Sequence, residues 1–212
     1  MKTTILSLLA LALLTLASLF VGVIDLTSGT MGLEEVWALV RDSRVPRTAA
    51  TILTGASLAV AGQIMQLIAR NKFVEPMTAG SGQSAALGIL LVVVFLPTAG
   101  IGTKMALAST MALLGSLGFF VIVQKLPPAQ PLLVPLVGLV YGGVIGAGVT
   151  YFAYQADMLQ YLEIWMNGEF SGTMRGRYEL LWIVGLATLM AYFVADQFTI
   201  LGLGEDVSIN LG

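Results

Sequence analysis

The chain has 212 residues, of which 57% are hydrophobic and only 10% are charged. Soluble domains carry about 25% charged residues, so this composition excludes an ordinary soluble domain and indicates an integral membrane protein. The net charge of −2 without a basic run gives no support to a nucleic-acid partner, and the absence of cysteine and histidine excludes disulfides and the usual Cys/His metal sites.

Six apolar stretches predict membrane helices, so the expected fold is an all-α polytopic transmembrane bundle. They cover about residues 5–24, 48–69, 77–96, 105–123, 132–154 and 180–194. The first is longer than the apolar core of 7–15 residues found in a signal peptide, so we expect a retained helix. Pro76 is expected to open the third helix, because a proline is tolerated in a first turn. Short helices are expected at residues 33–40, where Trp37 suits a membrane interface, and at 158–165.

The second predicted membrane helix carries features that favour contact with other helices. Gly55, Ala59 and Gly62 form a ridge of small residues at helical spacing, and Gln63 and Gln66 place amides in an apolar segment. Two interpretations stay open for these amides: hydrogen bonds across a helix seam, or the lining of a wet translocation pathway.

The fifth predicted membrane helix has the densest face of small residues. Gly138, Gly142 and Gly146 follow one another at steps of four residues. Such a face indicates either a tight seam between helices or a helix that lines a pathway or a subunit interface.

Three ordered groups of motifs resemble a known family. The first is RVPR at 44–47, GASLAVAGQIMQ at 55–66, RNKFVEP at 70–76 and TAGSGQSAALG at 78–88; the second is WMNG at 165–168 with SG at 171–172; the third runs from LGED at 203–206 to LG at 211–212. Together they resemble the membrane permease of the iron-siderophore, haem and cobalamin ABC importers, the BtuC-like permeases. Lys72, Phe73 and Val74 stand where that family usually has Pro-Leu-Ala, which resembles the branch for catecholate-type iron chelates.

The resemblance implies a permease subunit, and not an enzyme, that moves an iron(III)–siderophore complex across the bacterial inner membrane. The implied partners are a second permease subunit in a homo- or heterodimer, two ATP-binding subunits, a periplasmic or lipoprotein substrate-binding protein, the iron–siderophore substrate and membrane lipid. No cofactor is expected on this chain, because ATP and Mg²⁺ would bind the partner subunits. A haem or cobalamin permease of the same family stays open, as does an ion-coupled carrier or channel.

Arg44 and Arg47 are the expected docking residues for the substrate-binding protein. They lie three residues apart at the start of a helix, whose dipole repels cations, and the sequence offers no local partner. An external carboxylate would explain them, and the resemblance implies that arginines of this motif pair with acidic residues of the binding protein. Anchoring to lipid phosphate is the alternative.

Energy for transport is expected to come from a partner. None of the six predicted spans contains Asp, Glu, Lys, Arg or His, so they offer no evident proton relay, and the chain has no phosphate-binding loop of the GxxxxGK[ST] type. The resemblance implies that residues 196–212 form a cytoplasmic coupling segment. The residues expected to contact the ATPase are Gly204, Glu205, Asp206, Val207, Ile209 and Leu211. A helix that merely joins two spans is the alternative.

We expect one permease domain over residues 1–212, truncated at its C-terminal side, since the resembled family has about ten membrane helices. The basic residues of the loops mildly favour an external amino terminus. The resemblance implies a cytoplasmic amino terminus, and this is the orientation we expect.

Overall fold

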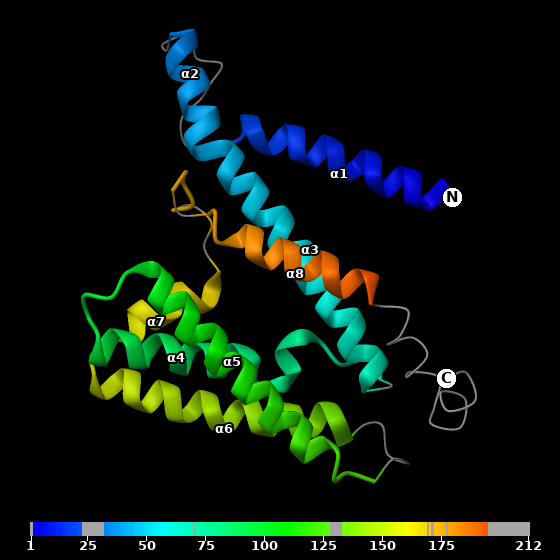
Figure 1. Cartoon of the computed structure of the whole chain (residues 1–212), viewed down its shortest axis with the longest axis vertical. Helices are drawn as coiled ribbons and strands as arrows, with labels where there is room; N and C mark the ends of the chain where they lie inside the picture. Colours follow the sequence, from blue (N-terminus) through cyan, green and yellow to red (C-terminus); the bar gives the residue numbers. More distant parts are fainter. Residues whose placement is uncertain are drawn as a thin grey trace. The chain divides into compact units, whose positions relative to one another are not determined.

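The computed structural model describes residues 2–22, 32–69, 71–127, 133–168, 170, 172–176 and 178–194. Every regular element within these ranges is helical, which confirms the all-α fold (Figure 1). The α-helices are α1 (Lys2–Phe20), α2 (Leu33–Leu39), α3 (Val45–Ile68), α4 (Ser81–Phe95), α5 (Ile101–Val123), α6 (Leu133–Gln155), α7 (Leu159–Asn167) and α8 (Leu181–Phe193). A π-helical segment, η1 (Val40–Arg44), and a 3₁₀ helix, η2 (Pro76–Ala79), complete the set.

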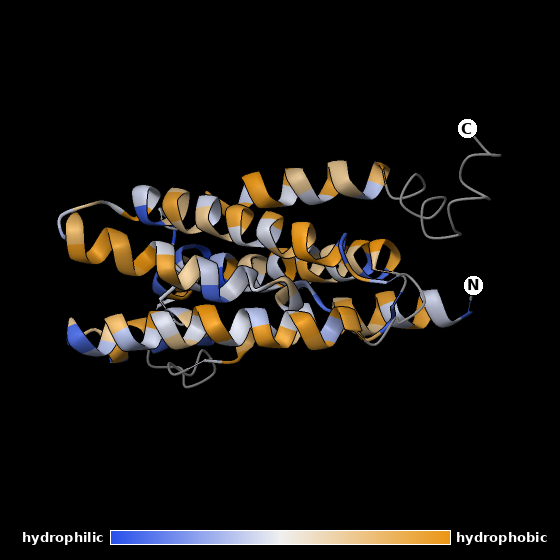
Figure 2. Ribbon diagram, turned by 90° about the horizontal axis from the view of Figure 1, so that it is seen from below, coloured by the Kyte–Doolittle hydropathy of each residue, from blue (hydrophilic) through white to orange (hydrophobic). Residues whose placement is uncertain are grey.

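Four helical stretches are long and apolar enough to cross a membrane. They are α1, the continuous stretch Leu33–Ile68, α5 and α6, with lengths of 19 to 36 residues. The apolar helices α4 and α8 are shorter, at 15 and 13 residues. A bilayer core requires about 20 helical residues. The helices α4 and α8, which correspond to the third and sixth predicted spans, are shorter than that. Figure 2 shows hydrophobic residues along the length of the helices, and many large apolar side chains are exposed, as contact with lipid requires.

The structure changes two predicted helix boundaries. The short helix expected at 33–40 is not separate, because α2 continues through η1 into α3. Pro46 is the second residue of α3, just beyond this π-helical turn, and it removes a backbone donor there. The third predicted helix is split: Pro76 opens η2, and α4 begins after Gly80. Gly80 has φ +68°, a left-handed conformation that favours glycine.

The chain divides into two compact units, which we describe separately. The first contains Met1–Ser57 and Phe170–Ala187. In it, the end of α1 meets the start of α3, and the hydroxyls of Ser18 and Thr48 lie 2.9 Å apart in a hydrogen bond. A Cβ placed on Gly185 of α8 would lie 2.9 Å from Leu53 of α3, so these helices pack closely.

The second unit contains Leu58–Glu169 and Thr188–Gly212, and α4 is its central helix. Figure 1 shows α4 beside α5 and α6, and α4 has its most extensive contact with α5. One core cluster joins α4 to α6 and α7, and a second surrounds Phe119 of α5 with Val74, Ala79 and Val134. This unit therefore has its own apolar core. The single permease domain over residues 1–212 stays a prediction.

Candidate functional site

The predicted docking arginines lie at the carboxyl end of α1, in the first unit. Nη1 of Arg44 donates to the carbonyl oxygen of Val21, and Nη2 of Arg47 donates to the same oxygen at 2.8 Å. Arg47 Nη2 also lies 3.5 Å from the carbonyl oxygen of Ser18. The last carbonyls of a helix lack intrahelical partners and carry its negative dipole end, so they suit two cations.

Arg44 and Arg47 have local partners, contrary to the expectation from the sequence. The sequence offered no local partner for Arg44 and Arg47, and the structure supplies the backbone carbonyl of Val21, directly after α1. The two arginines also differ in burial: Arg44 is only 4% exposed, whereas Arg47 is half-buried. Their role in docking stays a prediction.

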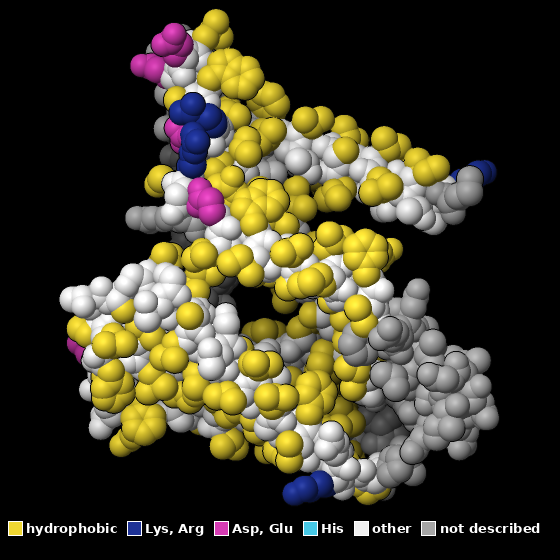
Figure 3. Space-filling model, viewed as in Figure 1, with side chains coloured by type: hydrophobic (Ala, Val, Ile, Leu, Met, Phe, Trp, Pro, Cys, Tyr) yellow, Lys and Arg dark blue, Asp and Glu magenta, His cyan; other side chains and the backbone are white. Residues whose placement is uncertain are grey.

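A cluster of charged side chains lies in the same unit. The Asp42 carboxylate accepts from Arg41 Nε at 2.9 Å and pairs with Arg175 at 3.6 Å, while the Arg175 backbone N–H donates to the Asp42 carbonyl oxygen at 3.0 Å. Glu179 accepts from the Gly176 N–H at 2.6 Å, and this bond holds the pKa of its carboxyl below the usual range. Figure 3 shows charged groups gathered around α2 and the segment before α8. The sequence pattern gave no signal for the pairing of Asp42 with Arg175, which are far apart along the chain.

The predicted glycine face of α6 packs against η2 and the first turn of α4. A Cβ on Gly138 would overlap the Thr78 carbonyl oxygen, and one on Gly142 would lie 3.5 Å from the Gln83 amide. A Cβ on Gly146 would lie 3.3 Å from Cγ of Gln83. These are the contacts of a close seam between helices.

The predicted glutamines of α3 occupy different surroundings. Gln63 is exposed and Gln66 is half-buried. On the same helix, Gly55 has open space around it, whereas a Cβ on Gly62 would lie 3.5 Å from the ring of Pro76. The nearest atoms of the α6 glycines belong to η2, α4 and α5, so the structure does not join the two sets of candidate residues in one contact.

Gln83 is a polar residue of the motif at 78–88 and was not among the predicted site residues. Its Oε1 atom is buried and has no hydrogen-bond partner in the described part of the chain. The residue lines an open pocket of about 510 Å³, together with Glu75, Thr78, Gly138 and Gly142. An amide in an apolar run was the available signal, the same one that drew attention to Gln63.

A polar contact joins α5 to α7. Lys104 Nζ donates to the Tyr161 hydroxyl at 2.9 Å and lies 5.4 Å from the centroid of the same ring. The helix predicted from residue 105 begins at Ile101, so this cation lies within the first turns of α5.

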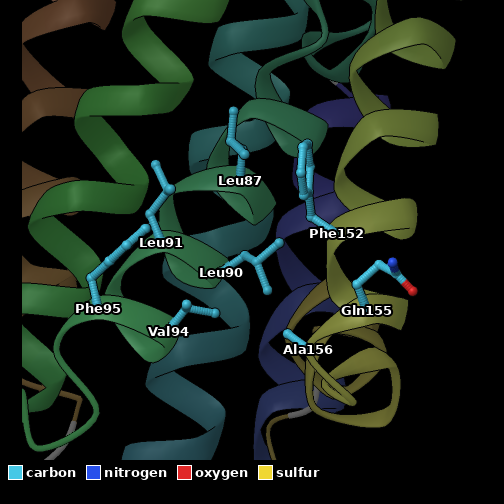
Figure 4. Close-up of a pocket in the computed structure, with 8 residues that line it drawn as sticks. All are labelled: Leu87, Leu90, Leu91, Val94, Phe95, Phe152, Gln155 and Ala156. Carbon is cyan, nitrogen blue, oxygen red and sulfur yellow. The ribbon is translucent and has the colours of Figure 1, made fainter.

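An apolar groove of about 390 Å³ lies in the second unit, and Figure 4 shows the side chains that line it. One wall consists of α4 side chains, and the other of residues at the end of α6. The lining residues are Leu87, Leu90, Leu91, Val94, Phe95, Phe152, Gln155 and Ala156. A wall of this composition suits an acyl chain or another helix better than a polar solute.

Two kinds of candidate site remain to be placed. The residues expected to contact the ATPase lie outside the described residues: Gly204, Glu205, Asp206, Val207, Ile209 and Leu211. Within the described ranges, no group of three or more acidic residues is arranged to hold a metal ion.

Residues 5–212 match the FecCD transport family. The chain is 37% identical over 211 residues to the petrobactin import system permease FatD of Bacillus anthracis, covering 100% of this chain and 62% of that protein. It is 40% identical over 179 residues to the ferric-anguibactin permease FatD of Vibrio anguillarum, covering 84% of this chain and 57% of that protein. The chain thus spans about three fifths of the length of these relatives.

A solved structure of a metal-chelate type ABC transporter in an inward-facing conformation has the same fold. The TM-score is 0.80 at 21% sequence identity, and the match covers 100% of this chain and 68% of that one. The likeness confirms the predicted architecture of an ABC importer permease.

Proposed function

Because the chain belongs to the FecCD transport family, we propose that it is the permease part of an ABC importer for an iron(III)–siderophore complex. The chain is a multi-pass helical membrane protein, and we place it in the bacterial inner membrane. The supporting observation is the identity of 37–40% to permeases named for petrobactin and anguibactin, over 84–100% of the chain.

The proposed cargo is iron enclosed in its chelator. Without cysteine or histidine, the chain has no thiolate or imidazole ligand for bare iron. Within siderophores, we propose the catecholate type. Iron hydroxamate and cobalamin are the alternative cargoes, because the chain is also 30% identical to an iron(3+)-hydroxamate permease, FhuB of Bacillus subtilis, and 32% identical to a vitamin B12 permease, BtuC of Vibrio vulnificus.

Uptake by cells that depend on the full-length protein tests the cargo. We expect accumulation of radiolabelled iron from ferric petrobactin or ferric anguibactin, and none of labelled cobalamin or haem. Uptake of cobalamin or haem, with no uptake of any ferric siderophore, would refute the proposal. An iron hydroxamate taken up in preference would correct the siderophore type.

We propose that ATP-binding partner subunits drive the transport and that residues 204–211 receive the force. A small shift of packed helices at that contact would open one side of the pathway while closing the other. Alanine replacement across residues 205–211 of the full-length protein should abolish ATP-powered uptake and recovery of the ATPase with the permease. Unchanged assembly and uptake would refute the coupling role. Uptake stopped by an uncoupler but not by ATP depletion would favour an ion-coupled carrier.

We place the contact with an acidic substrate-binding protein at the start of α3, where Arg47 lies in the first turn and Arg44 directly precedes the helix. A cytoplasmic amino terminus would put this end on the external side, where such a protein would bind. Changing both residues to Glu should lower the affinity for the binding protein by at least about tenfold, because like charges oppose one another at the contact. Lys72→Glu is the matched control, since Lys72 is an exposed cation near the opposite end of α3. Equal affinities in the double variant and the control would refute the docking site.

A further inference from the structure

The open pocket of about 510 Å³ in the second unit is lined by an acidic side chain, Glu75, directly before η2. Glu75 is exposed, and within the described residues no ion pair reaches its carboxylate. Its backbone N–H donates to the hydroxyl of Thr78 at 3.0 Å, and Thr78 lines the same pocket. A carboxylate accepts hydrogen bonds and donates none, so this corner of the pocket attracts a cation that carries N–H groups.

The Gln83 amide adds a second acceptor to the pocket. Its Oε1 atom is buried and has no donor in the described part of the chain, which destabilises the fold. A half-turn about the last side-chain torsion exchanges this oxygen with the amide nitrogen, so the oxygen can also face the pocket. Thr78 lies against Gly138 and Gln83 against Gly142, four residues further along α6, a separation of about 6 Å along the helix. One small ligand can therefore reach both acceptors.

The rest of the lining suits an organic cation better than a metal ion. Phe73, which is 80% exposed, stands beside Met77, Pro135 and Leu139 in the same pocket. An aromatic ring attracts an ammonium group, and apolar walls fit its alkyl substituents. Among the described residues, no three acidic side chains gather to hold a metal ion. The combination of carboxylate, amide and aromatic ring matches an alkylammonium group.

We propose that this pocket binds a protonated amine of the cargo, with the ammonium between Glu75 and Gln83 and its alkyl groups against Phe73. The proposal rests on the proposed function, since it takes a ferric chelate as the cargo. A ferric catecholate core carries negative charge, so Glu75 repels the core and attracts a cationic part of the chelate. The ammonium supplies the donor that the Gln83 oxygen lacks. The pocket thus makes the permease selective for chelates with an amine in their backbone.

Two substitutions remove the acceptors one at a time. Glu75→Gln keeps the size of the side chain and removes its charge, and Gln83→Met keeps the length and removes the amide. The matched controls are Glu163→Gln and Gln160→Met, which make the same changes at exposed positions of α7, outside the pocket.

Two ferric tris-catecholate chelates serve as probes. One has a secondary amine in its backbone, and the other is the same chelate with that amine acetylated, which removes the positive charge. Equilibrium binding of each chelate, labelled with radioactive iron, is measured on the full-length importer in lipid nanodiscs. The parent should bind the amine chelate at least about tenfold more tightly than the acetylated one. Glu75→Gln and Gln83→Met should each reduce this ratio to less than about threefold, whereas both controls keep it.

Three results would overturn the amine site. The first is equal binding of the two chelates by the parent, and the second is a preference kept in full by both variants. The third is a variant that weakens both chelates to the same extent, because the acetylated chelate offers no ammonium. If the parent shows no preference and Glu75→Gln lowers the recovery of the ATP-binding subunits, the acceptors bind a lysine or arginine of a partner, and the assignment to the cargo is wrong.

Uptake by cells that depend on the full-length protein separates this proposal from the proposed function. Uptake of ferric petrobactin or ferric anguibactin, together with equal binding of the two probe chelates, would refute the amine site alone. Uptake of cobalamin or haem, with no uptake of any ferric siderophore, would refute the function and the amine site together.

Discussion

The contact between α4 and α5 at Gly88 gives the sharpest test of the packing. Gly88 is buried, and a Cβ there would lie 2.7 Å from the carbonyl oxygen of Leu107 and 2.8 Å from Cα of Ala108. Both neighbours are backbone atoms of α5, so they cannot turn aside as a side chain would. A methyl group at this position must push the two helices apart.

The expected cost follows from two opposing effects. Overpacking a well-packed core costs about 1–3 kcal/mol, whereas replacing a helical glycine by alanine contributes about 1 kcal/mol in the other direction. Gly88→Ala should therefore lower the free energy of unfolding by up to about 2 kcal/mol, which corresponds to a fall in Tm of up to roughly 8 °C. Gly88→Val adds two further methyl groups and should lower the Tm more.

Thermal unfolding of the purified full-length protein in detergent, followed by tryptophan fluorescence, measures this effect. Gly143→Ala on α6 is the matched control, because no atom lies within 4 Å of a Cβ there. The control should keep the parent Tm or exceed it slightly. If Gly88→Ala melts at the same temperature as Gly143→Ala, the close approach of α4 and α5 is wrong.

Two further predictions concern polar groups. Gln83→Met should leave the Tm unchanged or raise it, because a buried amide oxygen without a partner costs about 1–3 kcal/mol. Gln63→Met, at an exposed position of α3, is the control. A larger fall in Tm for Gln83→Met than for the control would show that the Gln83 oxygen has a hydrogen-bond donor. The pKa of Glu179 is lowered, so its ionised carboxylate stabilises the segment before α8 at pH values above the ordinary carboxyl pKa, and this contribution is lost as the pH falls through the lowered pKa. The Tm difference between the parent and Glu179→Gln should therefore shrink as the pH is lowered from 7 to below about 4. A constant difference over that range would contradict the role of Glu179.

The apolar pattern of the chain was enough to place most helices. The predictions of helices at 105–123 and 132–154 lie within a few residues of α5 and α6. Runs of this kind are long, uncharged and bounded by proline or charged residues, so their ends are marked in the sequence itself. The glycine spacing of α6 likewise indicated a close contact, but it did not indicate which helix would be the partner.

Other features arose only when the chain was folded. The continuation of α2 into α3 and the break at Gly80 depend on local backbone geometry that the apolar pattern does not record. The partner of Asp42 lies far along the chain, so no local spacing could identify it. Packing decides which distant side chains meet, and periodicity reports only which face of a helix they share.

The surroundings of Arg44 and Arg47 show most clearly what the sequence alone could not predict. Their charge and spacing marked them as residues that need an acceptor, and the acceptors prove to be backbone carbonyls at the end of α1. Every residue carries the same carbonyl group, so a side-chain pattern cannot say which of them will be unpaired and near a cation. Which carbonyl accepts from the arginines depends on where α1 ends and on how closely α1 approaches α3. Tertiary packing alone decides how closely the two helices approach.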